Sequence, residues 1–290
     1  MTFQDSLTQA QADTQATLDA ILSPYGDTPV AQAMRYAVGG GKRLRAYLAL
    51  EAASLFDVPR DRALRAAAAI ECVHAYSLIH DDLPCMDDDD LRRGQPTVHR
   101  KWDEATAVLA GDALQTLAFE IVTDPATHPD GAVRANLALT LAQAAGGQGM
   151  VLGQALDIAA ETAGAPLTLD DISRLQRLKT GRLLEWPCRA GAVLAGADPA
   201  PLLDYAAKVG LAFQIADDLL DVEGDPEKAG KALRKDDQAG KATFVSLMGV
   251  EAARAQAVNL IAQSEVSLLI YSAKRANLVD VARYVVTRDR

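Results

Sequence analysis

The segment AAAAIECVHAYSLIHDDLPCMDDDD, residues 66–90, joins an alanine-rich apolar stretch to a dense group of aspartates. Its apolar part shows no strict alternation with polar residues, which predicts a helix that ends near the aspartates. The same pattern extends over the whole chain, where about one residue in five is alanine, the best helix former. Clusters of Gly, Pro and Asp predict breaks between helices at Ser23–Asp27, Val58–Arg60, Asp124–Gly131, Ala163–Pro166 and Gly196–Pro201.

These breaks predict an all-α protein of roughly ten or more helices. No shift in composition marks a second domain, so we expect residues 1–290 to form a single domain. Gly146, Gly147, Gly149 and Gly153 lie inside a helical pattern, where each costs about 1 kcal/mol relative to alanine. We expect these glycines to permit close contact between helices or to leave room for a ligand.

Charge and composition exclude several classes of partner. The chain has 29 basic and 39 acidic residues, a formal net charge of −10, so we expect no binding of nucleic acid or of anionic membranes by charge alone. The N-terminus lacks the features of a signal peptide, and no apolar run approaches the roughly 18 residues that span a bilayer. Cys72, Cys85 and Cys188 form no CxxC pair, which favours a reducing compartment. We therefore expect a cytoplasmic protein without stable membrane insertion.

Six carboxylates lie within ten residues, at Asp81, Asp82 and Asp87–Asp90. Such a run is usually a solvated surface, and that interpretation stays open. Apolar residues interrupt the run, however, and it lies inside a helical chain rather than on a tail. Oxygen ligands without His or Cys favour Mg²⁺ over zinc. Because Asp81 and Asp87 are about 240° apart on an ideal helix, they converge only if the helix ends or distorts near Pro84.

A second acidic group, DDLLD at residues 217–221, has a helical spacing. On a helix Asp217 and Asp221 differ by about 40° and point from one face, and Asp218 lies about 100° away. The flanking apolar residues would bury this helix, and buried carboxylates need cations. Mg²⁺ held by few carboxylates takes its other ligands from water and substrate phosphates. The two acidic groups together predict a site that binds a diphosphate through metal ions.

A glycine-rich turn brings cations into the same region of the sequence. GGGKRLR, residues 39–45, places Lys42 and Arg45 three residues apart after three glycines. It is not a Walker A motif, because the first glycine and the Ser or Thr after the lysine are absent. It is either a loop with solvated bases or a clamp for a second phosphorylated ligand. Arg92 and Arg93 directly follow the first acidic group and bind either its carboxylates or a ligand.

Several other polar residues mean little individually. His74 lies seven residues before Asp81, about 20° off the same helical face, but a lone histidine is more often structural. The same holds for Lys179, Thr180, Gln214, Lys231 and Lys241.

Taken together, these segments resemble the trans-isoprenyl diphosphate synthases, and among them the bacterial farnesyl type. The likeness runs from about Met34 to Thr243 and rests on the order and spacing of several segments. They are GGGKRLR, ECVHAYSLIHDDLPCMDDDDLRRGQPTVH, AVLAGDALQTLAF, GQALDI, LKTG, and FQIADDLLDVEGD followed by GKATF.

The resemblance implies the isoprenoid synthase fold, an array of helices around a central cavity, and a prenyltransferase activity. In that reaction isopentenyl diphosphate condenses head to tail with dimethylallyl and then geranyl diphosphate. Three Mg²⁺ ions are implied at Asp81, Asp87 and Asp217, with support from Asp82, Asp218 and Asp221. Arg92, Lys179 and Lys231 are implied to bind the allylic diphosphate, with Lys241 at its edge. Isopentenyl diphosphate is implied to bind Lys42, Arg45, His74 and Arg93.

The implied chemistry agrees with the residues present. Metal ions and cations face the leaving diphosphate, where negative charge develops, and the carbocation needs a dry apolar cavity. Lys179, Thr180 and Gln214 are implied to offer lone pairs or carbonyl dipoles near that cation. No residue stands out as a protein base, so we expect the departed diphosphate to accept the final proton.

Product length is implied by the residues just before the first acidic group. In the family, the residues four and five before it line the floor of the product cavity, and here they are Ser77 and Tyr76. An aromatic residue at the fifth position, with two extra residues between Asp81 and Asp87, resembles the bacterial farnesyl type. We expect a fifteen-carbon product, although ordinary core packing would also explain Tyr76.

Other interpretations stay open. A geranylgeranyl or other longer-chain synthase is the main alternative, and a non-catalytic subunit of a heteromeric synthase is the non-enzyme alternative. A class I terpene cyclase is disfavoured because it would lack the second DDxxD and need no second diphosphate site. The chain also departs from the family at Arg234–Asp236 and Phe244–Val245, in a segment that is usually a mobile lid. By analogy with the family, we expect a homodimer.

Overall fold

The computed structural model describes residues 2–161, 167–223 and 242–287 of the chain. These residues are overwhelmingly helical, which confirms the all-α prediction, with one short two-stranded ribbon as the exception. The chain divides into two compact units. Unit 1 comprises Met1–Leu139 and Ala190–Ala197, and unit 2 comprises Thr140–Arg189 and Asp198–Arg290. That residues 1–290 act as a single domain stays a prediction.

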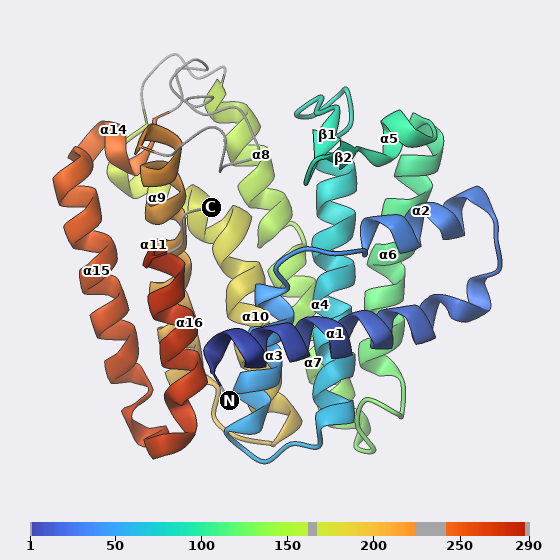
Figure 1. Cartoon of the computed structure of the whole chain (residues 1–290), viewed down its shortest axis with the longest axis horizontal. Helices are drawn as coiled ribbons and strands as arrows, with labels where there is room; N and C mark the ends of the chain where they lie inside the picture. Colours follow the sequence, from blue (N-terminus) through green and yellow to red (C-terminus); the bar gives the residue numbers. More distant parts are fainter. Residues whose placement is uncertain (1, 162–166, 224–241, 288–290) are drawn as a thin grey trace. The chain divides into compact units, whose positions relative to one another are not determined.

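Unit 1 is built around the long helices α4 and α6, which pack side by side (Figure 1). Its elements are α1 (Phe3–Leu22), η1 (Ser23–Tyr25), α2 (Pro29–Ala37), α3 (Leu44–Ser54), α4 (Arg60–Asp81), β1 (Leu91–Arg92), β2 (Gln95–Pro96), α5 (Val98–Lys101), α6 (Glu104–Thr123) and the first part of α7 (Gly131–Ala145). Ala66–Ala69 on α4 are at most 1% exposed. Side chains this small let neighbouring helices approach α4 closely, so the alanine-rich segment forms the centre of unit 1.

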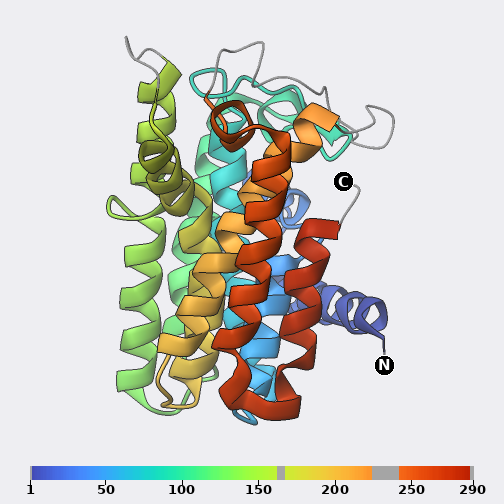
Figure 2. The ribbon, with the colours of Figure 1, turned by 90° about the vertical axis from the view of Figure 1, so that its left-hand side faces the viewer.

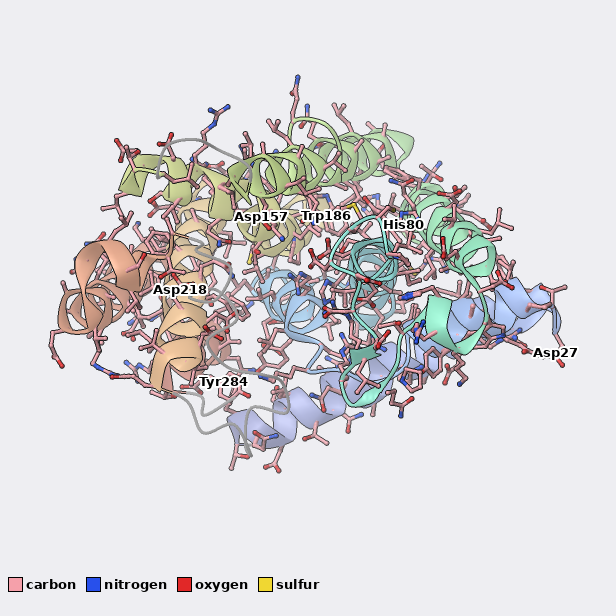
Figure 3. The ribbon with its side chains drawn as sticks, turned by 90° about the horizontal axis from the view of Figure 1, so that it is seen from above. Asp27, His80, Asp157, Trp186, Asp218 and Tyr284 are labelled. Carbon is pink, nitrogen blue, oxygen red and sulfur yellow. The ribbon has the colours of Figure 1, made fainter. Side chains whose placement is uncertain are left out.

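Unit 2 contains the helices that carry the second acidic group. Its elements are the end of α7, α8 (Met150–Glu161), α9 (Leu169–Gln176), a π-helical turn η2 (Arg177–Gly181), most of α10 (Arg182–Leu194), α11 (Ala200–Glu223), α14 (Phe244–Met248), α15 (Val250–Ser267), η3 (Leu269–Arg275) and α16 (Ala276–Thr287). Helices α15 and α16 run side by side and are joined by η3 (Figure 2). Trp186 is buried, and its Nε1 donates to Thr140 Oγ1 at 3.2 Å (Figure 3).

The predicted breaks agree with the helix ends in the described residues. Helices end and begin on either side of the breaks at Ser23–Asp27, Val58–Arg60, Asp124–Gly131 and Gly196–Pro201. The break at Ala163–Pro166 lies outside the described residues. Side-chain oxygens cap three of the helices: Thr28 caps α2 and Thr168 caps α9, each just after a predicted break, and Asp103 caps α6.

The glycine run has two different roles. Gly146, Gly147 and Gly149 form the turn between α7 and α8, so the expectation that they lie within a helix is wrong. Gly153 lies inside α8, where an added Cβ would be 2.1 Å from the backbone nitrogen of Lys179. At Gly153 the expected close contact between helical segments is confirmed.

In the described part of the chain, α6 is the one helix long and apolar enough to cross a membrane by those criteria alone. Half of its apolar window is buried inside the protein. An Asp and a Glu interrupt its apolar sequence, at Asp112 and Glu120, and its buried face packs against α4. The same composition is found in the core helices of many globular proteins.

Candidate active site

The first acidic group lies where α4 ends. The helix stops at Asp81, and the chain turns back through Leu83 and Pro84. The backbone nitrogen of Asp87 then donates to the carbonyl oxygen of Asp81 at 2.9 Å. The predicted convergence of these two residues is therefore confirmed for their backbones, because the helix ends as the proline suggested. Asp87 is exposed and Asp81 is half-buried.

Asp82 differs from its neighbours because it is 3% exposed. Its Oδ1 accepts a hydrogen bond from Arg92 Nε at 2.6 Å and lies 2.5 Å from Arg92 Nη2. Burial raises the pKa of the Asp82 carboxyl, and the Arg92 guanidinium opposes that shift. The structure thus places Asp82 as a partner of Arg92, and its predicted role beside a metal ion stays a prediction.

A short hairpin positions both arginines that follow the first acidic group. Residues Leu91–Arg92 pair antiparallel with Gln95–Pro96, and Arg92 lies opposite Gln95. Arg93 and Gly94 form the two-residue loop with φ of 54° and 73°. Positive φ at both positions is what a type I′ hairpin loop requires, and Gly94 adopts it without strain. This ribbon was not expected from the helical pattern.

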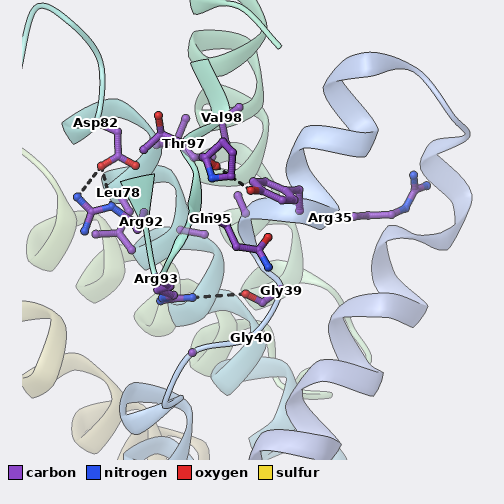
Figure 4. A pocket seen from close by; sticks show the side chains of 16 residues that line it. Arg35, Gly39, Gly40, Leu78, Asp82, Arg92, Arg93, Gln95, Thr97 and Val98 are labelled. Atoms are coloured by element: carbon purple, nitrogen blue, oxygen red, sulfur yellow. Dashed lines mark hydrogen bonds and ion pairs between the residues drawn. The ribbon is translucent and has the colours of Figure 1, made fainter. Parts of the chain in front are cut away.

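The hairpin covers the glycine-rich turn. Arg93 Nη1 lies 3.4 Å from the carbonyl oxygen of Gly39. At Gly41, with φ of 86°, an added Cβ would lie 2.7 Å from Arg93 Nη1, so only glycine leaves room for this guanidinium. A cavity of about 450 Å³ opens beside this contact (Figure 4). Its lining includes Gly39–Gly41, Leu78, Asp82, Arg92 and Arg93, together with aromatic and apolar residues of α2 and α4.

The other predicted ligands of isopentenyl diphosphate lie at the start of α3 and on α4. Lys42 is exposed, and Arg45 and His74 are half-buried. Arg45 Nη1 lies 3.4 Å from His74 Nε2. Burial, followed by the positive charge of Arg45, lowers the pKa of His74 well below its usual value. His74 is therefore a neutral imidazole among guanidinium groups, able to donate one hydrogen bond. These three residues do not line the 450 Å³ cavity, whereas Arg93 does.

The second acidic group lies on α11 without a helix break. Asp217, Asp218 and Asp221 all fall within this helix, which confirms the predicted helical spacing. Asp217 and Asp221 are half-buried, and Asp218 is 9% exposed. Asp218 Oδ2 accepts a hydrogen bond at 2.7 Å from the backbone nitrogen of Phe244, the first residue of α14. Gln214, one turn before Asp218, is also buried.

Lys179 lies in the π-helical turn η2, an irregularity that is frequent at functional sites. Its Nζ is 2.6 Å from Asp157 Oδ2 on α8, and both side chains are largely buried. The close approach of Gly153 brings α8 to this turn. Asp157 was missed as a site residue, although its place four residues after Gly153 in GQALDI was a usable signal. Thr180 is half-buried in the same turn, and Lys231 and Lys241 lie outside the described residues.

Tyr76 and Ser77 lie on α4 one turn before the first acidic group. Tyr76 is 4% exposed, and its ring meets the His80 ring edge to face at 5.9 Å. Burial raises the pKa of the Tyr76 hydroxyl. Ser77 Oγ donates to the carbonyl oxygen of His74 at 2.9 Å. An added Cβ at Gly111 of α6 would be 2.1 Å from His80 Nε2, so a glycine is required where His80 packs on α6.

The carboxylates fit a metal ion that is bound together with a substrate. Within residues 2–161, 167–223 and 242–287, no three His, Cys, Asp or Glu side chains gather closely enough to bind an ion unaided. The donors available are oxygens, with Asp87 exposed and Asp81 and Asp217 half-buried. Mg²⁺ is commonly bound by one or two carboxylates and completes its shell with water and substrate phosphates. The residues therefore fit Mg²⁺ that is held jointly with a diphosphate.

Comparison with known proteins shows the family to which the chain belongs. The family model for polyprenyl synthetases matches residues 27–272. A farnesyl diphosphate synthase of Escherichia coli (strain K12) is 47% identical, over 92% of each chain. Geranylgeranyl pyrophosphate synthase 9 of Arabidopsis thaliana is 40% identical over 94% of this chain and 78% of its own. The crystal structure of an FPP/GFPP synthase from Zymomonas mobilis is 46% identical, with a TM-score of 0.90 over 98% of this chain and 99% of that one. The chain belongs to the polyprenyl synthetase family.

Proposed function

We propose that the chain is a farnesyl diphosphate synthase. It condenses isopentenyl diphosphate with dimethylallyl and then geranyl diphosphate and depends on Mg²⁺. The observation that carries this proposal is the end of α4, where Asp81 and Asp87 are joined by a backbone hydrogen bond and two arginines follow in a hairpin. Carboxylates and cations placed together in this way suit a metal-bound diphosphate. The relatives named farnesyl diphosphate synthase support the same activity.

In unit 1, Asp81 and Asp87 would hold Mg²⁺, with Asp82 in support through Arg92. In unit 2, Asp217 would hold Mg²⁺, with Asp221 in support and with Asp218 hydrogen-bonded to the start of α14. Three ions are expected in total. Bound Mg²⁺ would neutralise the charge that develops on the leaving diphosphate.

The basic residues bind the diphosphates directly. Arg92 and Lys179 bind the allylic diphosphate, and Lys231 and Lys241 are assigned to it by the family resemblance. Lys42, Arg45 and Arg93 bind isopentenyl diphosphate, and the neutral His74 adds a hydrogen bond without adding charge.

The reaction breaks the allylic carbon–oxygen bond and forms a new carbon–carbon bond. Lys179, Thr180 and Gln214 orient dipoles toward the positive charge that develops on the allylic carbon. The departing diphosphate carries away the electron pair of the broken bond. It then accepts the proton lost from the condensed product, because no residue in the sequence stands out as a protein base.

A fifteen-carbon product is supported by the buried Tyr76 on α4. Geranylgeranyl or a longer product is the second candidate, because one relative is a geranylgeranyl pyrophosphate synthase and one solved structure is described as an FPP/GFPP synthase. A non-catalytic subunit is disfavoured because both acidic groups are present.

One incubation tests these alternatives. Purified protein with Mg²⁺ and isopentenyl diphosphate is given dimethylallyl, geranyl or farnesyl diphosphate, and the products are sized by chromatography. We expect condensation with the first two allylic substrates and a fifteen-carbon product. Efficient use of farnesyl diphosphate would support the longer-chain alternative. If the protein condensed none of the three allylic substrates, the proposed enzyme activity would be refuted.

A homodimer and a cytoplasmic location complete the proposal. Val108 and Leu109 on α6 are 41% and 54% exposed, and a second copy of the chain could cover them. A reducing compartment suits the three cysteines, since Cys72 and Cys188 are buried and unpaired and Cys85 is exposed and unpaired. Sedimentation of the purified protein would test the dimer.

A further inference from the structure

The three cations of the glycine-rich segment are not equivalent in the structure. Lys42 is exposed and Arg45 is half-buried, but Arg43 between them is 6% exposed. Arg43 is also the residue that precedes α3, and it has a positive φ of 54°. Non-glycine residues seldom adopt this conformation, because the Cβ crowds the backbone. Something in the fold must therefore hold Arg43 in place.

The buried carboxylate of Glu71 on α4 supplies that support. Arg43 Nη1 lies 2.9 Å from Glu71 Oε2, and both side chains are 4% exposed. The second oxygen, Glu71 Oε1, accepts a hydrogen bond at 3.0 Å from the backbone nitrogen of Ala46, in the first turn of α3. One carboxylate thus fixes both the Arg43 side chain and the start of the helix. An acceptor there also satisfies one of the N–H groups that a helix leaves free at its start.

Other hydrogen bonds also hold the Arg43 side chain and the backbone next to it. Its Nη2 donates to Gln15 Oε1 of α1 at 2.7 Å and to the carbonyl oxygen of Val38, at the end of α2. Gln11 of α1 donates from Nε2 to the carbonyl oxygen of Lys42 at 3.1 Å. The guanidinium therefore joins α1, α2 and α4 at one point, and it belongs to the residue that follows Lys42.

We propose that Arg43 and Glu71 are positioning residues that set Lys42 and Arg45 for isopentenyl diphosphate. The proposal rests on the proposed function. Lys42 precedes the strained residue and Arg45 follows it by two positions, so a change of φ at Arg43 displaces both cations. Glu71 and His74 lie one helical turn apart on α4, and His74 is the residue beside Arg45. The pair acts through Lys42 and Arg45 and does not itself contact a substrate.

The pair can be removed without leaving a buried charge. Replacing a buried ion pair by apolar residues of similar size is often neutral for folding, whereas removing one partner is not. The test variant is therefore Arg43→Met with Glu71→Leu. The matched control is Arg60→Met with Asp13→Leu, which removes an exposed ion pair between α4 and α1. Neither Arg60 nor Asp13 contacts the glycine-rich turn in the contacts described for them.

Two measurements separate positioning from general damage. Calorimetric titration with isopentenyl diphosphate gives its Kd, and steady-state kinetics give KM for isopentenyl and for geranyl diphosphate. We expect the test variant to weaken isopentenyl diphosphate binding by about 10²-fold, the scale of a misplaced binding group. KM for geranyl diphosphate should stay within about twofold, and the control should match the wild type in every constant. Arg43→Lys, which keeps the charge but loses the forked geometry, should give an intermediate Kd.

The outcomes distinguish this proposal from the proposed function. An unchanged Kd for isopentenyl diphosphate in the folded test variant, or in Arg43→Lys if the double variant does not fold, would overturn the positioning role. An equal loss for both substrates would overturn it as well, because that indicates general damage. Wild-type protein that binds isopentenyl diphosphate but forms no prenyl product would instead overturn the proposed function alone.

Discussion

The two acidic groups use different backbones for a similar arrangement of carboxylates. In unit 1, α4 stops at Asp81, and a turn returns the chain so that Asp87 meets it. In unit 2, Asp217 and Asp221 need no such turn, because they lie one turn apart on the continuous helix α11. In each group the second aspartate is buried and binds another part of its own unit. Each group therefore contains one buried carboxylate that supports the fold of its own unit.

The partners of the two buried aspartates differ. Asp82 binds the side chain of Arg92, a residue assigned to the allylic diphosphate, whereas Asp218 binds the backbone of Phe244. In unit 2, Lys179 is a basic residue assigned to the allylic diphosphate. Its carboxylate partner is Asp157 on α8, which is not part of the acidic group. Because these two aspartates accept hydrogen bonds within the protein, the number of aspartates alone does not give the number of metal ligands. In both units, a cation that we assign to the allylic diphosphate is paired with a carboxylate of the protein.

Removing one ligand carboxylate from each group should have the largest effect. Asp81→Ala and Asp217→Ala should each lower kcat by about 10³-fold, because each removes charge stabilisation from the leaving diphosphate. Steady-state assays across a Mg²⁺ titration would measure this loss. The control is Asp88→Asn, an exposed residue with φ of 49° that Asn tolerates, and it should stay near wild-type activity. Equal losses of kcat in all three variants would contradict the proposal that Asp81 and Asp217 bind Mg²⁺ whereas Asp88 does not.

Replacing the two buried aspartates should separate their roles. Asp82→Asn removes the charge that orients Arg92, and we expect kcat/KM for geranyl diphosphate to fall by about 10- to 100-fold. Asp218→Asn keeps an oxygen that can accept from the Phe244 amide, so its loss should be smaller than about tenfold. The two variants would be compared at saturating Mg²⁺ with their Tm values recorded. If Asp218→Asn proved the more damaging, Asp218 would act on the ligand directly.

Much of this arrangement could be predicted from local sequence signals. Gly and Pro clusters predicted the helix ends. Asp81 and Asp87 could meet only if the helix ended between them, and Pro84 predicted that end. These signals act over a few residues, because they concern backbone freedom and helix periodicity. The hairpin was not predicted in this way. Its strands are only two residues long, so they show no alternation of polar and apolar residues on either side of the loop at Arg93 and Gly94.

The sequence could not show which member of a like-charged group is buried. Lys42, Arg43 and Arg45 look alike in the sequence, and the buried partner of Arg43, Glu71, lies 28 residues away. Asp82 and Asp157 are likewise defined by partners on other elements. Burial of a charge depends on long-range packing that supplies its counter-ion, and periodicity carries no information about that packing.

A change at Tyr76 should alter the length of the product more than the rate of the reaction. Tyr76→Ala removes a buried ring from between α4 and its neighbours, which should lower the free energy of unfolding by about 3–5 kcal/mol. The space left should permit further condensation, so products longer than fifteen carbons should appear on chromatography. Tyr76→Phe keeps the ring and should keep the wild-type product. Unchanged product length in Tyr76→Ala would remove Tyr76 from this role.

The smallest effect expected is an acid sensitivity that His74 gives to unit 1. The pKa of His74 is lowered in the folded protein, whereas in the unfolded chain His74 binds a proton once the pH falls below its usual pKa of about 6.5. Between that value and the folded pKa the unfolded state holds more protons, so stability falls as pH falls, by at most about 1.4 kcal/mol per pH unit. His74→Gln should therefore flatten the dependence of unfolding free energy on pH below about 6.5, as measured by denaturant titration. Its stability difference from the wild type at pH 8, where the imidazole is neutral in both states, gives the purely structural cost. Parallel curves for the two proteins across the acid range would show that His74 does not carry this sensitivity.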